Sequence, residues 1–172
     1  MSKETDLAWL AGILDGEGTI SFGVSTRHGG RLCIVPLITI VNSDEEILRQ
    51  SSDLLKEIVA DAGTVDRQSH RIGVGSFKGH KACFAIRVAS WAAELVLVAV
   101  MPYLVCGYKR KAAEAIMEFI KYRRENLLER DKLGRITRVG YPKHLVELVA
   151  SVRSHKNAKP LSEMLKAPNI TH

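Results

Sequence analysis

The chain has 172 residues, of which 46% are hydrophobic and 26% are charged, so it is able to bury a core and is not a disordered protein. Its formal net charge of +6 favours an acidic partner, nucleic acid first and an anionic membrane second. The longest apolar stretch, Leu95–Cys106, contains Pro102 and is too short to cross a bilayer.

Cysteine usage and the N-terminus bear on the compartment. Cys33, Cys83 and Cys106 form no CxxC pair and no zinc pattern, which indicates reduced thiols. The N-terminus lacks a signal-peptide pattern, because the first apolar run is interrupted by Asp15. We therefore expect an intracellular protein, in the cytoplasm, the nucleoid or an organelle matrix, that is not secreted and has no membrane partner.

The first elements alternate between two periodicities. Residues 6–15 show helical spacing of apolar residues, with Asp6 as the expected N-cap. Apolar residues then alternate with polar ones over 19–27 and 31–41, which predicts two strands joined by a hairpin turn at His28-Gly29-Gly30.

The remaining elements follow in the same manner. Ser43-Asp44-Glu45-Glu46 is a capping-box sequence with Ser43 as the cap, and it opens a helix to about Ala62. A second strand pair is expected within 64–90, where the clearer return strand has Phe84, Ile86 and Val88 on one face. Further helices are expected at 91–104, 109–125, 144–154 and 161–166.

The resulting order, α-β-β-α-β-β-α-α, predicts an α+β fold. Two strand pairs separated by a helix suggest one four-stranded antiparallel sheet, with helices on its apolar face and a polar, basic opposite face. We expect a single domain over 1–172, with a core at about 6–125 and a basic helical C-terminal extension at about 126–172.

Charge is segregated along the chain. Residues 121–172 hold twelve Lys/Arg and five Asp/Glu, and the expected strand regions 19–43 and 63–90 hold seven basic residues and one acid. The helix between them carries Asp44, Glu45, Glu46, Asp53, Glu57 and Asp61. This segregation predicts a folded molecule with a basic face.

One nine-residue segment forms a recognisable sequence motif. Leu10-Ala11-Gly12-Ile13-Leu14-Asp15-Gly16-Glu17-Gly18 resembles the LAGLIDADG signature of homing endonucleases, and it lies at the expected helix-to-strand junction. The resemblance implies an αββαββα core with a saddle-shaped sheet. It also implies that two copies of the motif helix pack together, and since the chain has one copy, a homodimer of the single-motif type is expected.

The motif helix carries small residues suited to close helix packing. Leu7, Ala8, Ala11 and Gly12 are the expected dimer interface, because small side chains let two helix backbones approach. From composition alone, tight packing of this helix within its own domain is the alternative.

The resemblance also implies site residues. Glu17 is the expected catalytic and metal-binding acid, with the Gly16 carbonyl beside the same ion, and Mg²⁺ is the expected metal, with Mn²⁺ or Ca²⁺ able to occupy the same sites. Asp15 is expected to cap or buttress the helix end. Lys109 is expected to face the scissile phosphates, with Lys111 as its rival, and Asn42 to lie near the water network. The alternatives are a solvated lysine and a helix-capping asparagine.

Arginine, glutamine and serine side chains on a two-stranded ribbon are suited to reading base edges in the major groove. The basic tail, with Arg135, Arg138, Lys143, Arg153, Lys156 and Lys159, is expected to contact flanking phosphates. The full set of expected DNA-binding residues is Ser21, Ser25, Arg27, Arg31, Cys33, Thr39, Arg67, Gln68, His70, Arg71, Lys78, Lys81, Arg87, Arg110, Lys111, Arg138 and Lys143.

The sequence therefore predicts a site-specific endonuclease that binds a long pseudo-palindromic duplex as a homodimer and hydrolyses one phosphodiester per strand with a divalent metal. Two alternatives stay open. One is a non-cleaving nucleic-acid binder of the same fold, an RNA-splicing maturase or a transcription regulator. The other is a basic structural protein that uses the sheet to bind partners.

Overall fold

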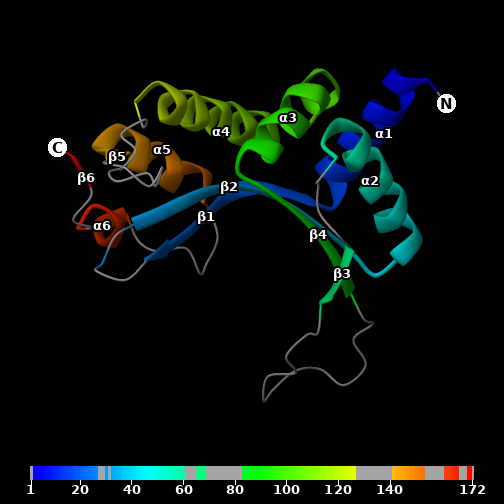
Figure 1. Ribbon diagram of the computed structural model, residues 1–172, viewed down its shortest axis with the longest axis horizontal. Coiled ribbons are helices and arrows are strands. Elements are labelled where there is room, and N and C mark those ends of the chain that lie inside the picture. The colour runs from blue at the N-terminus through cyan, green and yellow to red at the C-terminus, as the bar shows by residue number, and fades with distance from the viewer. Residues whose placement is uncertain are drawn as a thin grey trace, which may run out of the picture. The chain divides into compact units, whose positions relative to one another are not determined.

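The computed structural model describes residues 2–26, 30, 32–60, 65–68, 83–126, 141–153, 161–166 and 170–171. Within them the elements follow in the order α1, β1, β2, α2, β3, β4, α3, the 3-10 helix η1, α4, β5, α5, α6 and β6 (Figure 1). The predicted α+β class and the α-β-β-α-β-β-α-α order are confirmed.

Four strands form one sheet in the order β1-β2-β4-β3. They are β1 (Gly18–Thr26), β2 (Leu32–Asn42), β3 (Val65–Gln68) and β4 (Cys83–Ala89). β4 pairs antiparallel with both β2 and β3. Ile38 lies opposite Val88 and Ile40 opposite Ile86, all four buried, so one face of the β2–β4 pair belongs to the core. The predicted four-stranded sheet is therefore present, and its two strand pairs meet at β2 and β4.

The chain groups into two compact units. Unit 1 comprises Met1–Ile20 and Leu37–Arg110, and unit 2 comprises Ser21–Pro36 and Lys111–His172. β1, β2 and α4 (Gly107–Asn126) each contribute residues to both units.

In unit 1, α1 (Lys3–Gly16), α2 (Glu45–Ile58) and α3 (Trp91–Val100) contact one another, and α2 and α3 also contact β4. Leucines form much of this core, and full burial of each contributes about 1.5–3 kcal/mol. The completely buried ones are Leu10, Leu14, Leu48, Leu55 and Leu97. This core holds α1, and therefore the end of the motif helix, against the rest of unit 1.

Unit 2 is centred on Phe119 of α4. The Phe22 ring meets it edge-on, with ring centroids 5.2 Å apart, and the Tyr141 ring stacks on it with centroids 5.7 Å apart. α5 (Lys143–Val152) buries an apolar face in the same unit. α6 (Leu161–Met164) and the two-residue parallel strands β5 (Tyr141–Pro142) and β6 (Ile170–Thr171) complete the described part.

The helix ends differ from the prediction. α1 starts at Lys3 with Ser2 as its N-cap, because the Ser2 hydroxyl accepts a hydrogen bond from the Thr5 amide; the cap was expected at Asp6. α2 is capped by Asp44 rather than Ser43, because the Asp44 carboxylate accepts from the Glu46 amide at 2.9 Å.

Other boundaries are also shifted. α2 ends at Ile58, four residues before the expected Ala62. α4 begins at Gly107, two residues before Lys109. None of the described helices has the combination of length and apolar character needed to cross a bilayer.

Candidate active site

The end of α1 leads directly into β1. The Glu17 amide donates to the Ile13 carbonyl at 2.8 Å and closes the helix, and Gly18 is already the first residue of β1. A Cβ atom at Gly18 would lie 2.7 Å from both the Cα and the carbonyl oxygen of Leu14. Only glycine therefore allows the start of β1 to lie so close to the last turn of α1. The Glu17 backbone is held between these two elements.

The Glu17 side chain is exposed, and its carboxylate has no hydrogen-bond or ion-pair partner among the described residues. It stands at the C-terminal end of a helix, where the helix dipole places partial negative charge. An acid at that end is unfavourable unless a cation lies near it.

The donors at this position are suited to a hard divalent cation. The Glu17 carboxylate and the Gly16 carbonyl supply oxygen ligands, as Mg²⁺ prefers, and Mg²⁺ binds through one or two carboxylates plus waters and phosphate oxygens. In the described part of the chain, no three His, Cys, Asp or Glu side chains group as a metal site. Within those residues, Glu17 is therefore not part of a larger cluster of such side chains.

Asp15 and Lys109 connect the end of α1 to the start of α4. Asp15 Oδ2 accepts from the amides of Val105, at 2.7 Å, and Cys106, at 3.2 Å. Lys109 Nζ donates to the carbonyls of Leu14, at 2.5 Å, and Asp15, at 2.6 Å. Asp15 Oδ1 is buried and has no partner among the described residues, which costs about 1–3 kcal/mol for an unpaired polar atom.

One face of α1 has open space beside it. Ala8, Gly12 and Gly16 are all exposed, and they follow one another at intervals of four residues. A Cβ atom at Gly12 or Gly16 would meet nothing within 4 Å. The fold of the subunit therefore does not itself require glycine at these two positions.

The other expected interface residues lie deeper. Leu7 is half-buried, and Ala11 is completely buried within unit 1. The spacing of Ala8, Gly12 and Gly16 is readable in the sequence, but Gly16 was expected only as a metal-site carbonyl.

Asn42 has a local role in the subunit, whereas the basic residues that follow Lys109 are exposed. Asn42 Oδ1 accepts from the Asp44 amide at 2.9 Å, so it organises the turn before α2. No hydrogen bond among the described residues joins it to Glu17 or Lys109. Arg110 and Lys111 are exposed on α4.

Several of the expected DNA-reading residues of unit 1 lie on paired strands of the sheet. Thr39 is directly opposite Arg87, so both lie on the face opposite the buried isoleucines, and Arg87 is exposed. In β3, Gln68 is opposite Cys83 and Arg67 is opposite Phe84.

The expected DNA-reading residues of unit 2 are accessible to different degrees. Ser25 is exposed, whereas Ser21 and the free thiol of Cys33 are half-buried. Lys143 is exposed, and its Nζ lies 3.9 Å from Oε1 of Glu147. The remaining expected contacts fall outside the described residues: Arg27, Arg31, His70, Arg71, Lys78, Lys81 and Arg138.

Arg153 differs from a solvated phosphate-binding side chain. It is half-buried, and burial lowers the pKa of its guanidinium. Its Nη1 is buried without a partner among the described residues. The tail residues Arg135, Lys156 and Lys159 lie outside those residues.

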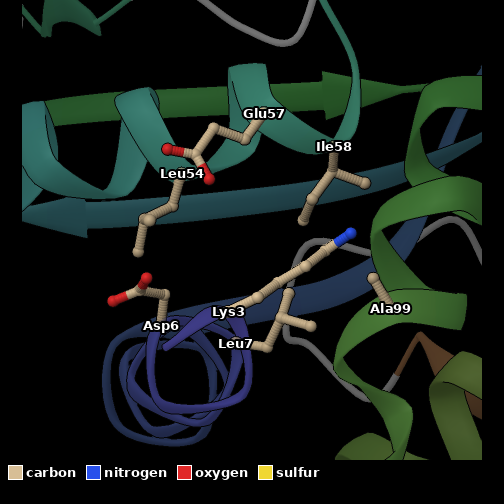
Figure 2. Close-up of a pocket in the computed structure, with 7 residues that line it drawn as sticks. All are labelled: Lys3, Asp6, Leu7, Leu54, Glu57, Ile58 and Ala99. Atoms are coloured by element: carbon tan, nitrogen blue, oxygen red, sulfur yellow. The ribbon is translucent and has the colours of Figure 1, made fainter. Parts of the chain in front are cut away.

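A pocket of about 180 Å³ lies in unit 1 between α1, α2 and α3 (Figure 2). Lys3, Asp6 and Leu7 line it from the first part of α1, and the Lys3 side chain extends along it in Figure 2. Glu17 follows the other end of the same helix. The pocket is therefore separate from the exposed carboxylate.

No family model and no curated protein matches the sequence, but solved structures match the fold. The homing endonuclease I-CvuI in complex with its target aligns with a TM-score of 0.67 and 20% identity, over 95% of this chain and 94% of that chain. The archaeal intron-encoded homing endonuclease I-Vdi141I, complexed with DNA, aligns with a TM-score of 0.63 and 14% identity, over 95% of this chain and 94% of that chain.

A third match differs in chain length. The LAGLIDADG homing endonuclease I-SmaMI, bound to cleaved DNA, aligns with a TM-score of 0.60 and 15% identity, over 96% of this chain but 51% of that chain. Likeness at these identities establishes architecture, and together with the element order and sheet topology it shows that this chain has the fold of the LAGLIDADG homing endonucleases.

Proposed function

We propose that the protein is a site-specific endonuclease that binds duplex DNA as a homodimer and hydrolyses one phosphodiester in each strand with the help of Mg²⁺. The observation that carries the proposal is the end of α1. There, an exposed face of small residues leads to an exposed carboxylate that a single subunit leaves without a partner. The structures of this fold named above hold DNA, which supports the choice of substrate.

The open face of α1 supports the proposed homodimer. Ala8, Gly12 and Gly16 let a second helix backbone approach closely, and with one such helix per chain the partner is the same helix of a second copy. Chain length agrees with this arrangement. The protein matches nearly all of I-CvuI and about half of I-SmaMI, as expected if the longer chain contains two copies of this fold.

Dimer symmetry brings two Glu17 carboxylates together near the two-fold axis. Like charges held close require a compensating cation, which supports metal binding by Glu17 with the Gly16 carbonyl beside it. When bound there, Mg²⁺ activates water and offsets phosphate charge. The chain's own contribution is to hold Glu17 rigidly through Gly18 and the last turn of α1. For Asn42, the family resemblance implies a position near the attacking water.

The sheet supplies DNA recognition in this proposal. Thr39 and Arg87 form a polar, accessible pair opposite the core face of β2 and β4, and Ser25 is exposed on β1. β2 has 11 residues, and an extended strand of that length spans about 36 Å, or roughly ten base pairs per subunit. Arg87 is suited to bidentate contact with guanine, and exposed cations such as Arg110, Lys111 and Lys143 to phosphate contacts.

The test substrate is a plasmid that carries the gene's insertion site in its uninterrupted form, with the two flanking sequences joined. Wild type is expected to cut it in Mg²⁺ and not in EDTA. Glu17→Gln is expected to lower the single-turnover rate by at least about a thousandfold while DNA binding in Ca²⁺ stays within a few-fold of wild type. Glu118→Gln, an exposed acid on α4, is the matched control and cuts normally. Site-specific DNA binding without cutting by wild type would contradict the proposal and favour the non-cleaving alternative.

Salt dependence separates DNA binding from use of the sheet for protein partners. If each complex contacts six to ten phosphates, affinity falls by about 10³–10⁵ between 50 and 200 mM salt. Binding that is insensitive to salt would favour the structural alternative.

A further inference from the structure

We infer that Lys109 is a positioning residue: together with Asp15 it clamps the end of α1 to the start of α4 and so fixes where Glu17 stands. This inference rests on the proposed function for its consequence in catalysis. The clamp itself is a property of the folded subunit and can be tested without DNA or metal.

The two side chains make reciprocal contacts. The Asp15 carboxylate, on α1, accepts from the two backbone amides that directly precede α4, those of Val105 and Cys106. The Lys109 ammonium, on α4, donates to two backbone carbonyls of α1, those of Leu14 and Asp15. Each element therefore supplies a charged side chain to the other element's main chain. All four hydrogen bonds lie within unit 1.

The clamp acts on the residues next to Glu17. Lys109 binds the carbonyls two and three residues before it, and the Glu17 amide closes the same helical turn on the Ile13 carbonyl. Gly18 then fixes the path on the other side. The Glu17 backbone is consequently held from both directions, and only its side chain remains to be oriented.

Charge gives the clamp a second effect. The C-terminal end of α1 carries partial negative charge, and Glu17 adds a full negative charge beside it. The Lys109 ammonium sits against these carbonyls and offsets part of that charge. In a dimer with two such helix ends side by side, both lysines would lower the repulsion between the paired sites.

The same geometry favours a positioning role over direct contact of these two side chains with DNA. A lysine ammonium has three N–H donors, and Lys109 spends two of them on carbonyls at 2.5 and 2.6 Å. Asp15 has no accessible role toward a negatively charged substrate, because Oδ2 already accepts two amides and Oδ1 is buried. If Lys109 works through α1, the loss of Asp15 should resemble the loss of Lys109.

The first test is a double-mutant cycle in urea on the full chain, without metal or DNA. Lys109→Met and Asp15→Ala are each expected to raise the unfolding equilibrium constant by roughly tenfold to a hundredfold, since each removes hydrogen bonds to a charged group. The double variant is expected to raise this constant by clearly less than the product of the two single increases, because both side chains act on one cluster. Lys121→Met, an exposed lysine on the same helix, is the control and stays at wild-type stability.

Amide exchange provides a local readout if a variant is too unstable for the cycle. Lys109→Met is expected to speed exchange at Val105 and Cys106, which bond to Asp15 rather than to Lys109. Lys109→Arg and Asp15→Asn keep a donor and an acceptor, and both are expected to restore most of the protection. Unchanged exchange in Lys109→Met would overturn the clamp.

Cleavage then tests the consequence. Asp15→Ala is expected to slow single-turnover cutting by roughly a hundredfold, as Lys109→Met does, because displacement of Glu17 by about 1 Å has an effect of that size. Lys109→Arg is expected to recover most of the rate. Near-wild-type cutting by Asp15→Ala beside a large loss in Lys109→Met would assign Lys109 to the substrate and refute positioning. If wild type itself fails to cut, the proposed function fails while the unfolding cycle still decides the clamp.

Discussion

α1 and α2 are helices of equal length, 14 residues each, in the same unit, yet their outer faces carry different kinds of side chain. The outer face of α2 is charged. Arg49 Nη2 and Glu45 Oε1 are 2.7 Å apart. Their hydrogen bond and charge attraction raise the pKa of the Arg49 guanidinium. Asp53 and Lys56 form a second exposed pair at 3.4 Å.

The outer face of α1 instead runs through Ala8, Gly12 and Gly16. Glycine weakens a helix by about 0.8–1.0 kcal/mol relative to alanine, and nothing in the subunit approaches either glycine. Two exposed helix faces of one unit can therefore differ completely in the side chains that they present. α2 is finished by ion pairs with water around them, whereas α1 remains open for another backbone.

The largest expected effect is loss of the dimer in Gly12→Leu. The added side chain meets nothing in its own subunit but would block a second helix, so we expect the dimer Kd to rise by roughly a thousandfold or more, or about 4 kcal/mol. Sedimentation equilibrium of the free protein measures it, with circular dichroism to show that the subunit is folded. Gln50→Leu, exposed on α2, is the control. A Gly12→Leu protein that dimerises like wild type would break the comparison.

The next effect is within one subunit. Gly18→Ala places a Cβ atom 2.7 Å from backbone atoms of Leu14, which neither element can accommodate without shifting. We expect the free energy of unfolding to fall by about 3 kcal/mol. Urea denaturation in the Gly12→Leu background measures this without a contribution from dimerisation. An unchanged midpoint would mean that the helix-to-strand junction is looser than described.

Gly16→Ala sharpens the contrast two residues earlier. There the added methyl group meets open space, and alanine is better suited to a helix than the glycine that it replaces. In the same Gly12→Leu background we expect the free energy of unfolding to stay level or rise by up to about 1 kcal/mol. A loss of stability similar to that of Gly18→Ala would contradict the open face.

The smallest effect is expected on α2. Arg49→Ala removes a pair in which both side chains are largely exposed, 64% for Arg49 and 44% for Glu45. Exposed pairs contribute little, because water and salt screen them and both side chains lose freedom. We expect almost no change in the urea midpoint, and none at high salt. A large loss would show that α2 also depends on its outer face.

Much of the fold follows from periodicity. The alternation in β1, β2 and β4 predicts strands with one buried face, and the buried residues Ile20, Phe22, Ile38, Ile40 and Ile86 lie on it. The cap of α2 was misplaced because two cap-forming residues are adjacent: Ser43 and Asp44 are both suitable, and backbone geometry decides between them. β5 and β6, with two residues each, are too short to leave a periodic pattern.

The site was predictable in part. The motif located Glu17 and the helix-to-strand junction, and the four-residue spacing of Ala8, Gly12 and Gly16 was visible. The contacts of Asp15 with Val105 and Cys106 join residues 90 and 91 positions apart. A single sequence contains no signal for such a pairing, because the residues involved contribute only backbone amides.

The direct passage from Glu17 to Gly18 has a consequence for altering the target. The acid that would cut and the strand that would read are consecutive in the chain, with no linker to absorb a change between them. Under the proposed function, substitutions on β1 and β2 would therefore alter which bases are preferred, while the cut would keep its offset from the centre of the site. Insertions at this junction would instead uncouple the two tasks, so retargeting should proceed by exchanging strand side chains at constant length.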